Sequence, residues 1–148
     1  MSVIFSKSCE YAIQAILFLA KSSNGKPILM RDISQTLNVP HPYPSKIFQT
    51  LTHHGILLSH KGPSGGFALA HPATAIALID VVREVDGDAF LNQCILGFAS
   101  CSDRNPCPAH SSWMIAKSLL LNLLQQKTVE ELSRELSSKL ESGHKLSA

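Results

Sequence analysis

The sequence predicts a mainly α-helical fold with one small β-hairpin, and three observations on its 148 residues support this class. Apolar residues recur at helical spacing in most segments that lie between turn-forming residues. A single glycine-rich turn at residues 62–66 separates two short extended runs, as in a hairpin. Residues 108–126 form a long, leucine-rich segment, as expected for a helix that packs against a partner helix. Hydrophobic residues make up 45% of the chain, which is enough for a buried core.

The first segment predicts a buried helix. Ser6 or Ser8 can cap it, and Glu10 then lies in its first turn, where a carboxylate complements the helix dipole. Residues 11–20 are apolar on nearly every side, so this helix should lie in the core. The Asn-Gly-Lys-Pro turn at residues 24–27 ends it.

Two short helices, joined by a few residues, follow this turn. The first spans residues 30–37, and Asn38 suits the left-handed residue that ends a helix. The second runs from about Tyr43 to His54, with Pro44 in its first turn, where no backbone donor is needed. This layout predicts a helix-turn-helix.

The second of these helices has an apolar and a polar face. Three apolar residues can face inward: Ile47, Phe48 and Leu51. Four polar residues recur at i, i+3, i+4 and i+7 on the opposite side: Lys46, Gln49, Thr50 and His53. Such a face can contact phosphates and base edges, although an ordinary solvated face has the same pattern.

The segment after the second helix decides between these interpretations. Residues 56–61 and 67–70 read as the two strands of a hairpin, with His60 and Lys61 near its tip. Glycines at the turn permit positive φ and let the backbone approach a phosphate. A hairpin with only a structural role would not need three glycines and a basic tip together. The sequence therefore predicts the wing of a winged helix-turn-helix.

Charge is divided unevenly along the chain. Residues 1–70 contain six Lys and Arg against two acidic residues, whereas residues 71–148 contain seven against nine. A basic first half suits a nucleic-acid-binding unit. We therefore expect a winged helix-turn-helix DNA-binding domain at 1–72, a cluster-binding loop with dimerisation helices at 73–141, and a disordered tail at 142–148.

The second half predicts three helices around a loop. A helix near residues 78–85 precedes the loop, and Pro108 opens the long helix, which ends near Gln126. Its apolar residues should meet a partner helix in a homodimer: Trp113, Ala116, Leu119, Leu120, Leu123 and Leu124. Thr128 and Glu131 form a capping box for the last helix.

The loop holds the pattern Cys94-x6-Cys101-x5-Cys107-x2-His110, interrupted by turn-forming residues. Three sulfurs and an imidazole in one short stretch favour a bound metal or an iron–sulfur cluster. A disulfide and unligated thiols are the simpler alternatives. No secretory signal is visible, and the apolar run at 11–20 is too short to span a bilayer, so we expect a reducing cytoplasmic location and no membrane partner. In that compartment a cysteine cluster more often binds metal or is redox-active.

Three motifs together resemble the Rrf-type winged-helix transcription regulators, and in particular their IscR-like iron–sulfur branch. They are the opening Ser6-Lys7…Glu10-Tyr11-Ala12, the wing sequence at 59–69 of the form S-x-K-G-x-x-G-G-F-x-L, and the cysteine loop with its C-x2-H-x2-W ending. The resemblance covers about residues 6–136. It implies a homodimer in which the long helix crosses its mate, with recognition helices in adjacent major grooves of a two-fold operator and wings at the minor groove.

The polar helix face and the wing tip, together with the resemblance, predict the site residues. The DNA-binding set is Tyr43, Ser45, Lys46, Gln49, Thr50, His53, His60, Lys61, Gly65 and Gly66. Lys61 takes the place of the family's wing arginine, and Ser45 and Lys46 replace its recognition-helix Glu-Gln pair. Because Arg and Lys are not equivalent in base recognition, these differences put the operator sequence in question.

The cluster ligands that the resemblance implies are Cys94, Cys101, Cys107 and His110, around a 2Fe–2S cluster whose state alters DNA binding. A 4Fe–4S cluster, with Glu10 of the partner subunit as fourth ligand, is the alternative. From the residues alone, a structural zinc ion, a cluster-free thiol redox switch and a regulator that binds a metabolic enzyme also stay open. A thiol enzyme would need a base and an orienting partner outside the cluster, and none is apparent, so we expect neither catalysis nor a small-molecule substrate.

Overall fold

The structure is a computed structural model, and it describes residues 4–22, 24–39 and 43–141, without the side chains of Tyr43 and residues 137–141. The tail predicted at 142–148 lies outside these residues. The elements are α1 (Lys7–Ser22), α2 (Met30–Leu37), α3 (Tyr43–His53), β1 (Leu57–His60), β2 (Gly66–Leu69), a 3-10 turn (Ala73–Ala75), α4 (Leu78–Asp86), α5 (Ala89–Asn92), α6 (His110–Gln126) and α7 (Val129–Glu141).

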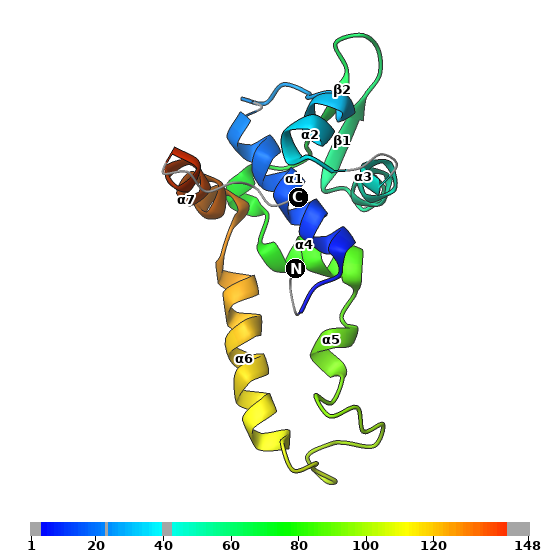
Figure 1. Ribbon diagram of the computed structural model, residues 1–148, viewed down its shortest axis with the longest axis vertical. Helices are drawn as coiled ribbons and strands as arrows, with labels where there is room; N and C mark the ends of the chain where they lie inside the picture. The colour runs from blue at the N-terminus through cyan, green and yellow to red at the C-terminus, as the bar shows by residue number, and fades with distance from the viewer. Residues whose placement is uncertain (1–3, 23, 40–42, 142–148) are drawn as a thin grey trace.

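Helix α1 is the centre of the fold (Figure 1). It packs against α2, α3, α4, β2 and α7, because its apolar residues lie on nearly every side, as the sequence predicts. Helix α6 and the loop after α5 extend away from this body and form a long projection. The chain thus places its cysteine loop at one end of the molecule and the hairpin at the other.

Two apolar clusters stabilise the body. The larger joins α1 to the helix-turn-helix and includes Ile16, Leu19 and Phe48, all at most 1% exposed. The smaller joins α1, α4 and α6 through residues such as Cys9, Val82 and Leu124. The second cluster explains how the projecting helix α6 is fixed to α1 and α4 in the body of the molecule.

Local sequence signals position most helix ends as predicted. Ser6, rather than Ser8, caps α1, because its Oγ accepts the N–H of Cys9 at 3.1 Å. Asn38 ends α2 with φ of 52°. Thr128 and Glu131 form the predicted capping box, with the Thr128 N–H donating to Glu131 Oε2 at 3.0 Å and the Glu131 N–H donating to Thr128 Oγ1 at 3.2 Å.

Helix α6 begins two residues later than predicted. The N–H of His110 donates to the carbonyl of Cys107 at 3.0 Å, so Pro108 lies in a tight turn before the helix rather than in its first turn. The short helix α5 between Asp88 and Gln93 was not predicted at all, since four residues are too few for a periodic pattern. Both differences lie next to the cysteine loop.

The hairpin pairs β1 and β2 in an antiparallel register from Leu57↔Leu69 to His60↔Gly66. Ile28, just before α2, adds a two-hydrogen-bond bridge to Phe67 on the outer edge of β2, with both N···O distances 2.9 Å. Two backbone hydrogen bonds therefore join the outer edge of the hairpin to the segment just before α2. Together these elements confirm the predicted mainly helical, winged fold.

No helix among the described residues is both long and apolar enough to cross a membrane.

Candidate functional site

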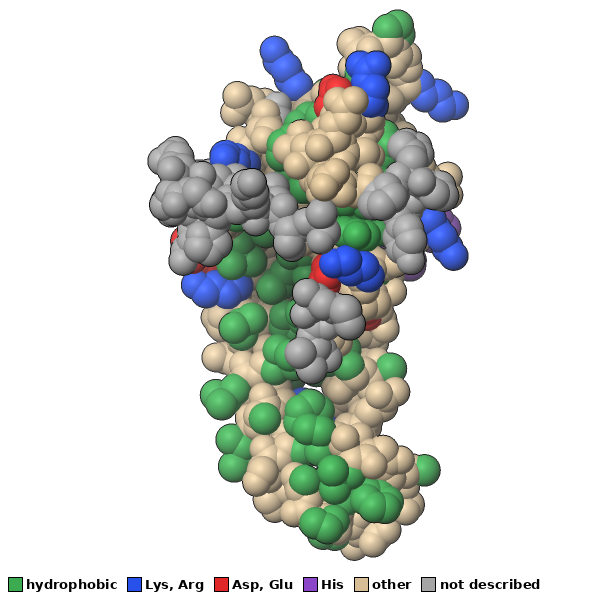
Figure 2. Space-filling view, viewed as in Figure 1, with side chains coloured by type: hydrophobic (Ala, Val, Ile, Leu, Met, Phe, Trp, Pro, Cys, Tyr) green, Lys and Arg blue, Asp and Glu red, His purple; other side chains and the backbone are tan. Residues whose placement is uncertain are grey.

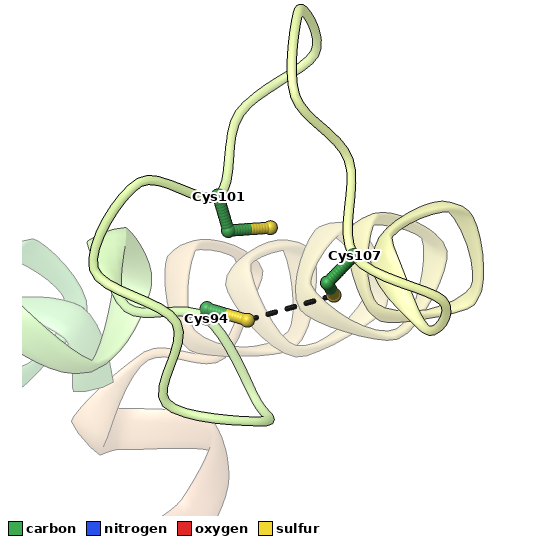
Figure 3. Close-up of side chains that lie close together, drawn as sticks. All are labelled: Cys94, Cys101 and Cys107. Carbon is green, nitrogen blue, oxygen red and sulfur yellow. Dashed lines mark hydrogen bonds between the residues drawn. The ribbon is translucent and has the colours of Figure 1, made fainter.

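The three loop cysteines converge on one point (Figure 3). Cys94 follows α5, Cys101 lies in mid-loop and Cys107 precedes α6, yet their sulfurs all lie within 4.8 Å of one another. Cys94 Sγ and Cys107 Sγ are 3.5 Å apart. Within the part of the chain that the structure describes, no other Cys, His, Asp and Glu side chains form such a group.

His110 reaches this group through one sulfur. It is the first residue of α6, and its Nδ1 lies 3.2 Å from Cys101 Sγ. Its Nε2 lies 2.9 Å from Asp103 Oδ1. The imidazole is thus placed between a thiol and a carboxylate, with one ring nitrogen directed to each.

The environment separates the thiol pKa values. Partial burial tends to raise the pKa of Cys94, but the backbone N–H groups of Phe98 and Leu96 and the neighbouring thiols lower it to about 7. Burial raises the pKa of Cys107, and the Cys94 and Cys101 thiols raise it further, against a backbone hydrogen bond from Ala109. Because the thiolate is the metal-binding form, Cys94 is more readily prepared to bind at neutral pH than Cys107.

The donor set fits the group that the sequence implies. Three thiolates and one imidazole are ligands that both iron–sulfur clusters and zinc accept. The loop is fixed at its base, where Trp113 Nε1 donates to the carbonyl of Gln93 at 2.9 Å. A metal or cluster would therefore bind to three thiols that are already gathered, while His110 contacts one of them, Cys101.

Glu10 and Cys9 lie away from this site within one chain. Both are on α1, in the body of the molecule, whereas the cysteine loop is at the far end of α6 (Figure 1). Glu10 pairs with Lys7 Nζ at 2.9 Å. Cys9 is fully buried, and burial, followed by the nearby Asp86, raises its pKa to about 12, so it packs as an apolar residue. Only a second subunit could bring Glu10 to the loop.

The predicted recognition helix shows the expected two faces. Ile47, Phe48 and Leu51 are buried, and Lys46, Gln49 and His53 are exposed. Thr50 is partly exposed and donates its hydroxyl to the Lys46 carbonyl at 3.0 Å. Beside this face lies a hollow of about 850 Å³, lined by Ser8, Ser45, Lys46, Ile47, Gln49, Thr50 and Val85. Ser45 is half-buried there, and the Tyr43 side chain lies outside the described residues.

The wing brings His60 and Lys61 to the surface, and Figure 2 shows Lys and Arg side chains projecting at this end of the molecule. Its glycines have a structural reason. A Cβ on Gly65, which is buried, would lie 2.2 Å from the His60 carbonyl oxygen, and one on Gly66 would lie 2.2 Å from that of Ile28. Gly66 also has φ of 126°. Close backbone packing, within the hairpin for Gly65 and against Ile28 for Gly66, therefore accounts for both glycines.

Two polar contacts were missed by the sequence analysis. His54 Nδ1 lies 2.6 Å from Glu84 Oε2 and joins the end of α3 to α4, and Asp103 joins His110 as described above. Both pairs connect residues from separate turns or elements, so no local pattern marks them. For the second pair, the one signal in the sequence is the position of Asp103, an acidic residue two positions after the ligand candidate Cys101.

The apolar stripe of α6 divides between two roles. Leu124 is buried in the smaller apolar cluster and Leu120 packs against it, so this side of the helix contributes to the core of its own subunit. Ile115, Leu119 and Leu123 recur every four residues on another side and are 65%, 68% and 51% exposed. Exposed leucines in a row of this kind are typical of an interaction surface.

The fold and this site define a winged helix-turn-helix transcription regulator, and comparisons with known proteins identify its family. The Rrf2 family, described as iron-dependent transcriptional regulators, matches residues 5–135, and the chain belongs to this family. It is 30% identical over 123 residues to the HTH-type transcriptional regulator IscR of Escherichia coli O1:K1, covering 83% of this chain and 75% of that protein. It is therefore a regulator of a DNA-binding family, not an enzyme.

Solved structures agree on the fold. CymR of B. subtilis, the global cysteine regulator, matches with a TM-score of 0.75 at 24% identity, covering 90% of this chain and 98% of that one. IscR of T. potens matches with a TM-score of 0.72 at 21% identity, covering 97% and 92%. At these identities the likeness establishes the fold alone. The predicted winged-helix fold is thus confirmed.

Proposed function

We propose that this chain is a homodimeric regulator whose affinity for a two-fold DNA operator is controlled by a 2Fe–2S cluster on Cys94, Cys101, Cys107 and His110. The convergence of three sulfurs within 4.8 Å, with an imidazole on Cys101, carries the proposal. The likeness to the regulator IscR supports it. A bound cluster would supply one-electron redox chemistry and a site that oxidants can attack. In this proposal residues 1–72 bind DNA and residues 73–141 bind the cluster and the partner subunit.

Helix α4 connects the cysteine loop to the recognition helix, so it can transmit a conformational change from the cluster site to the DNA-binding surface. Arg83 Nε donates to Asp88 Oδ1 at 2.8 Å, just before α5 and the loop. At the end of α4, the Asp86 carboxylate accepts a hydrogen bond from the N–H of Ser6, at the start of α1, at 2.8 Å. Glu84 on the same helix pairs with His54 at the end of α3. A shift of α4 would therefore move the recognition helix.

The first test compares DNA binding with and without the cluster. Anaerobically purified protein and chelator-treated apoprotein should differ in their dissociation constants for a duplex selected from a random library. Coupling between two sites is typically 5- to 150-fold, so we expect at least about tenfold. A Cys107→Ala variant, treated in the same way, should show no difference. Equal affinities for the two wild-type forms would contradict cluster control, and zinc in the purified protein would favour a structural metal.

The second test locates the DNA contacts. Lys46→Ala and Lys61→Ala should each weaken binding and lower the slope of log affinity against log salt by roughly one, because each lost phosphate contact releases one counterion fewer. Fluorescence anisotropy at several salt concentrations measures both quantities. Arg134→Ala is the matched control, since Arg134 is 73% exposed on α7, across α1 from α3 (Figure 1). Unchanged slopes in both lysine variants would remove this surface from the interface.

A further inference from the structure

The cysteine loop contains a carboxylate that the proposed ligand set does not use. Asp103 Oδ1 lies 2.9 Å from His110 Nε2, and His110 Nδ1 lies 3.2 Å from Cys101 Sγ. A neutral imidazole donates from one ring nitrogen and accepts at the other. Because an ionised carboxylate can only accept, Asp103 selects the tautomer with hydrogen on Nε2. The Nδ1 lone pair is then directed toward Cys101 Sγ, one of the three loop sulfurs.

The loop itself holds Asp103 in place. Ser102 and Asn105 exchange backbone hydrogen bonds, with N···O distances of 3.2 and 3.0 Å, and so close a tight turn around Asp103. The Asn105 side chain donates to the Ser100 carbonyl at 3.3 Å and ties this turn to the preceding segment. The His110 side chain is 14% exposed and that of Asp103 is 91% exposed. A carboxylate on the outside of the loop thus orients a ring on the inside.

We propose that Asp103 is a positioning residue, which holds the His110 ring so that Nδ1, and not Nε2, is presented to the metal or cluster on the three thiolates. The inference rests on the proposed function, because it requires His110 as the fourth ligand. Metal-binding histidines usually donate their other N–H to a carboxylate or carbonyl, and loss of that partner costs about 10- to 100-fold in metal affinity. Solvent screens the exposed Asp103, so about tenfold is expected.

Co²⁺ titration of anaerobic apoprotein tests the proposal, because thiolate and imidazole ligation give Co²⁺ a visible spectrum. Asp103→Ala should weaken Co²⁺ binding by about tenfold and shift the ligand-field bands. Asp103→Asn removes the charge but keeps an acceptor oxygen, and Asp103→Glu keeps both, so each should retain most of the affinity. Equal losses in the Ala and Asn variants would indicate a charge effect and overturn the positioning role.

A double-mutant cycle shows whether Asp103 acts through the ring. In a His110→Ala background, Asp103→Ala should have no further effect on Co²⁺ affinity. The same tenfold loss in that background would overturn the inference. So would a wild-type Co²⁺ affinity in the Asp103→Ala variant alone. In both cases, normal Co²⁺ and iron binding by the wild-type protein would leave the proposed function intact. A wild-type protein that bound neither Co²⁺ nor iron would overturn both.

Discussion

Replacing Cys94, Cys101 or Cys107 with alanine is expected to abolish the visible absorption of the anaerobically purified protein. Each sulfur is one of three that converge within 4.8 Å, and thiolates supply most of the charge that holds the irons of a cluster. Iron, sulfide and zinc analysis of the same samples measures the loss directly. Bound iron should fall to background in all three variants, because two thiolates and an imidazole are too few ligands.

Cys9→Ala is the matched control. Cys9, on α1, is buried against residues of α4 and α6. Its replacement therefore removes a core side chain but no ligand. Absorption and iron content should therefore stay at wild-type levels per folded molecule. Iron or zinc that survived the combined loss of all three loop cysteines would end the cluster hypothesis.

The fourth ligand separates two versions of the proposal. A loss or marked shift of the spectrum in His110→Ala alone would support ligation within one chain, as the 3.2 Å contact with Cys101 suggests. A shift in Glu10→Ala alone would support ligation from the partner subunit. The second outcome would tie the cluster directly to α1 and hence to the DNA-binding half.

Sequence reasoning predicted the fold where local chemistry determines it. The bounds of α2, the left-handed Asn38 and the capping box at Thr128 all follow from residues within one helical turn of each other. The gathering of the three cysteines was also predictable, because turn-forming residues in a short loop leave few other arrangements.

The features that sequence reasoning missed depend on tertiary contacts. The glycines of the turn predict a close approach to a phosphate, but at Gly66 the backbone of Ile28 also requires a glycine. The pairs His54–Glu84 and Asp103–His110 join residues 30 and 7 positions apart. No periodicity or motif encodes such pairs, so only the folded chain reveals them.

The cysteine loop also exposes apolar side chains, which bears on the oligomeric state. Ile95, Leu96 and Phe98 are each more than half exposed, and they lie on the same projection as the exposed row of α6. Figure 2 shows hydrophobic side chains gathered over this projecting end of the molecule. Such a surface is costly in a monomer and is typical of a protein–protein interface. The proposed dimer would cover it with a second copy of the same helix.

Leu119→Glu and Leu123→Glu are accordingly expected to convert the proposed dimer to a monomer. Each change would bury an unpaired carboxylate in the interface, at a cost of several kcal/mol, and about 2.7 kcal/mol already corresponds to a hundredfold weaker association. Leu119 is 68% and Leu123 51% exposed in one chain, so neither change disturbs the core of the subunit. Leu120 is a poorer probe, because it packs against the cluster around Leu124.

Sedimentation velocity across a concentration series measures the shift, and circular dichroism checks that the helices persist. Gln125→Glu is the matched control, since it adds the same charge on an exposed side of α6 roughly 120° around the helix from Leu119. It should leave the dimer intact. A dimer that survived both leucine variants would place the interface elsewhere. If the monomers form, their affinity for a two-fold operator should also fall, because each subunit would then bind one half-site without its mate.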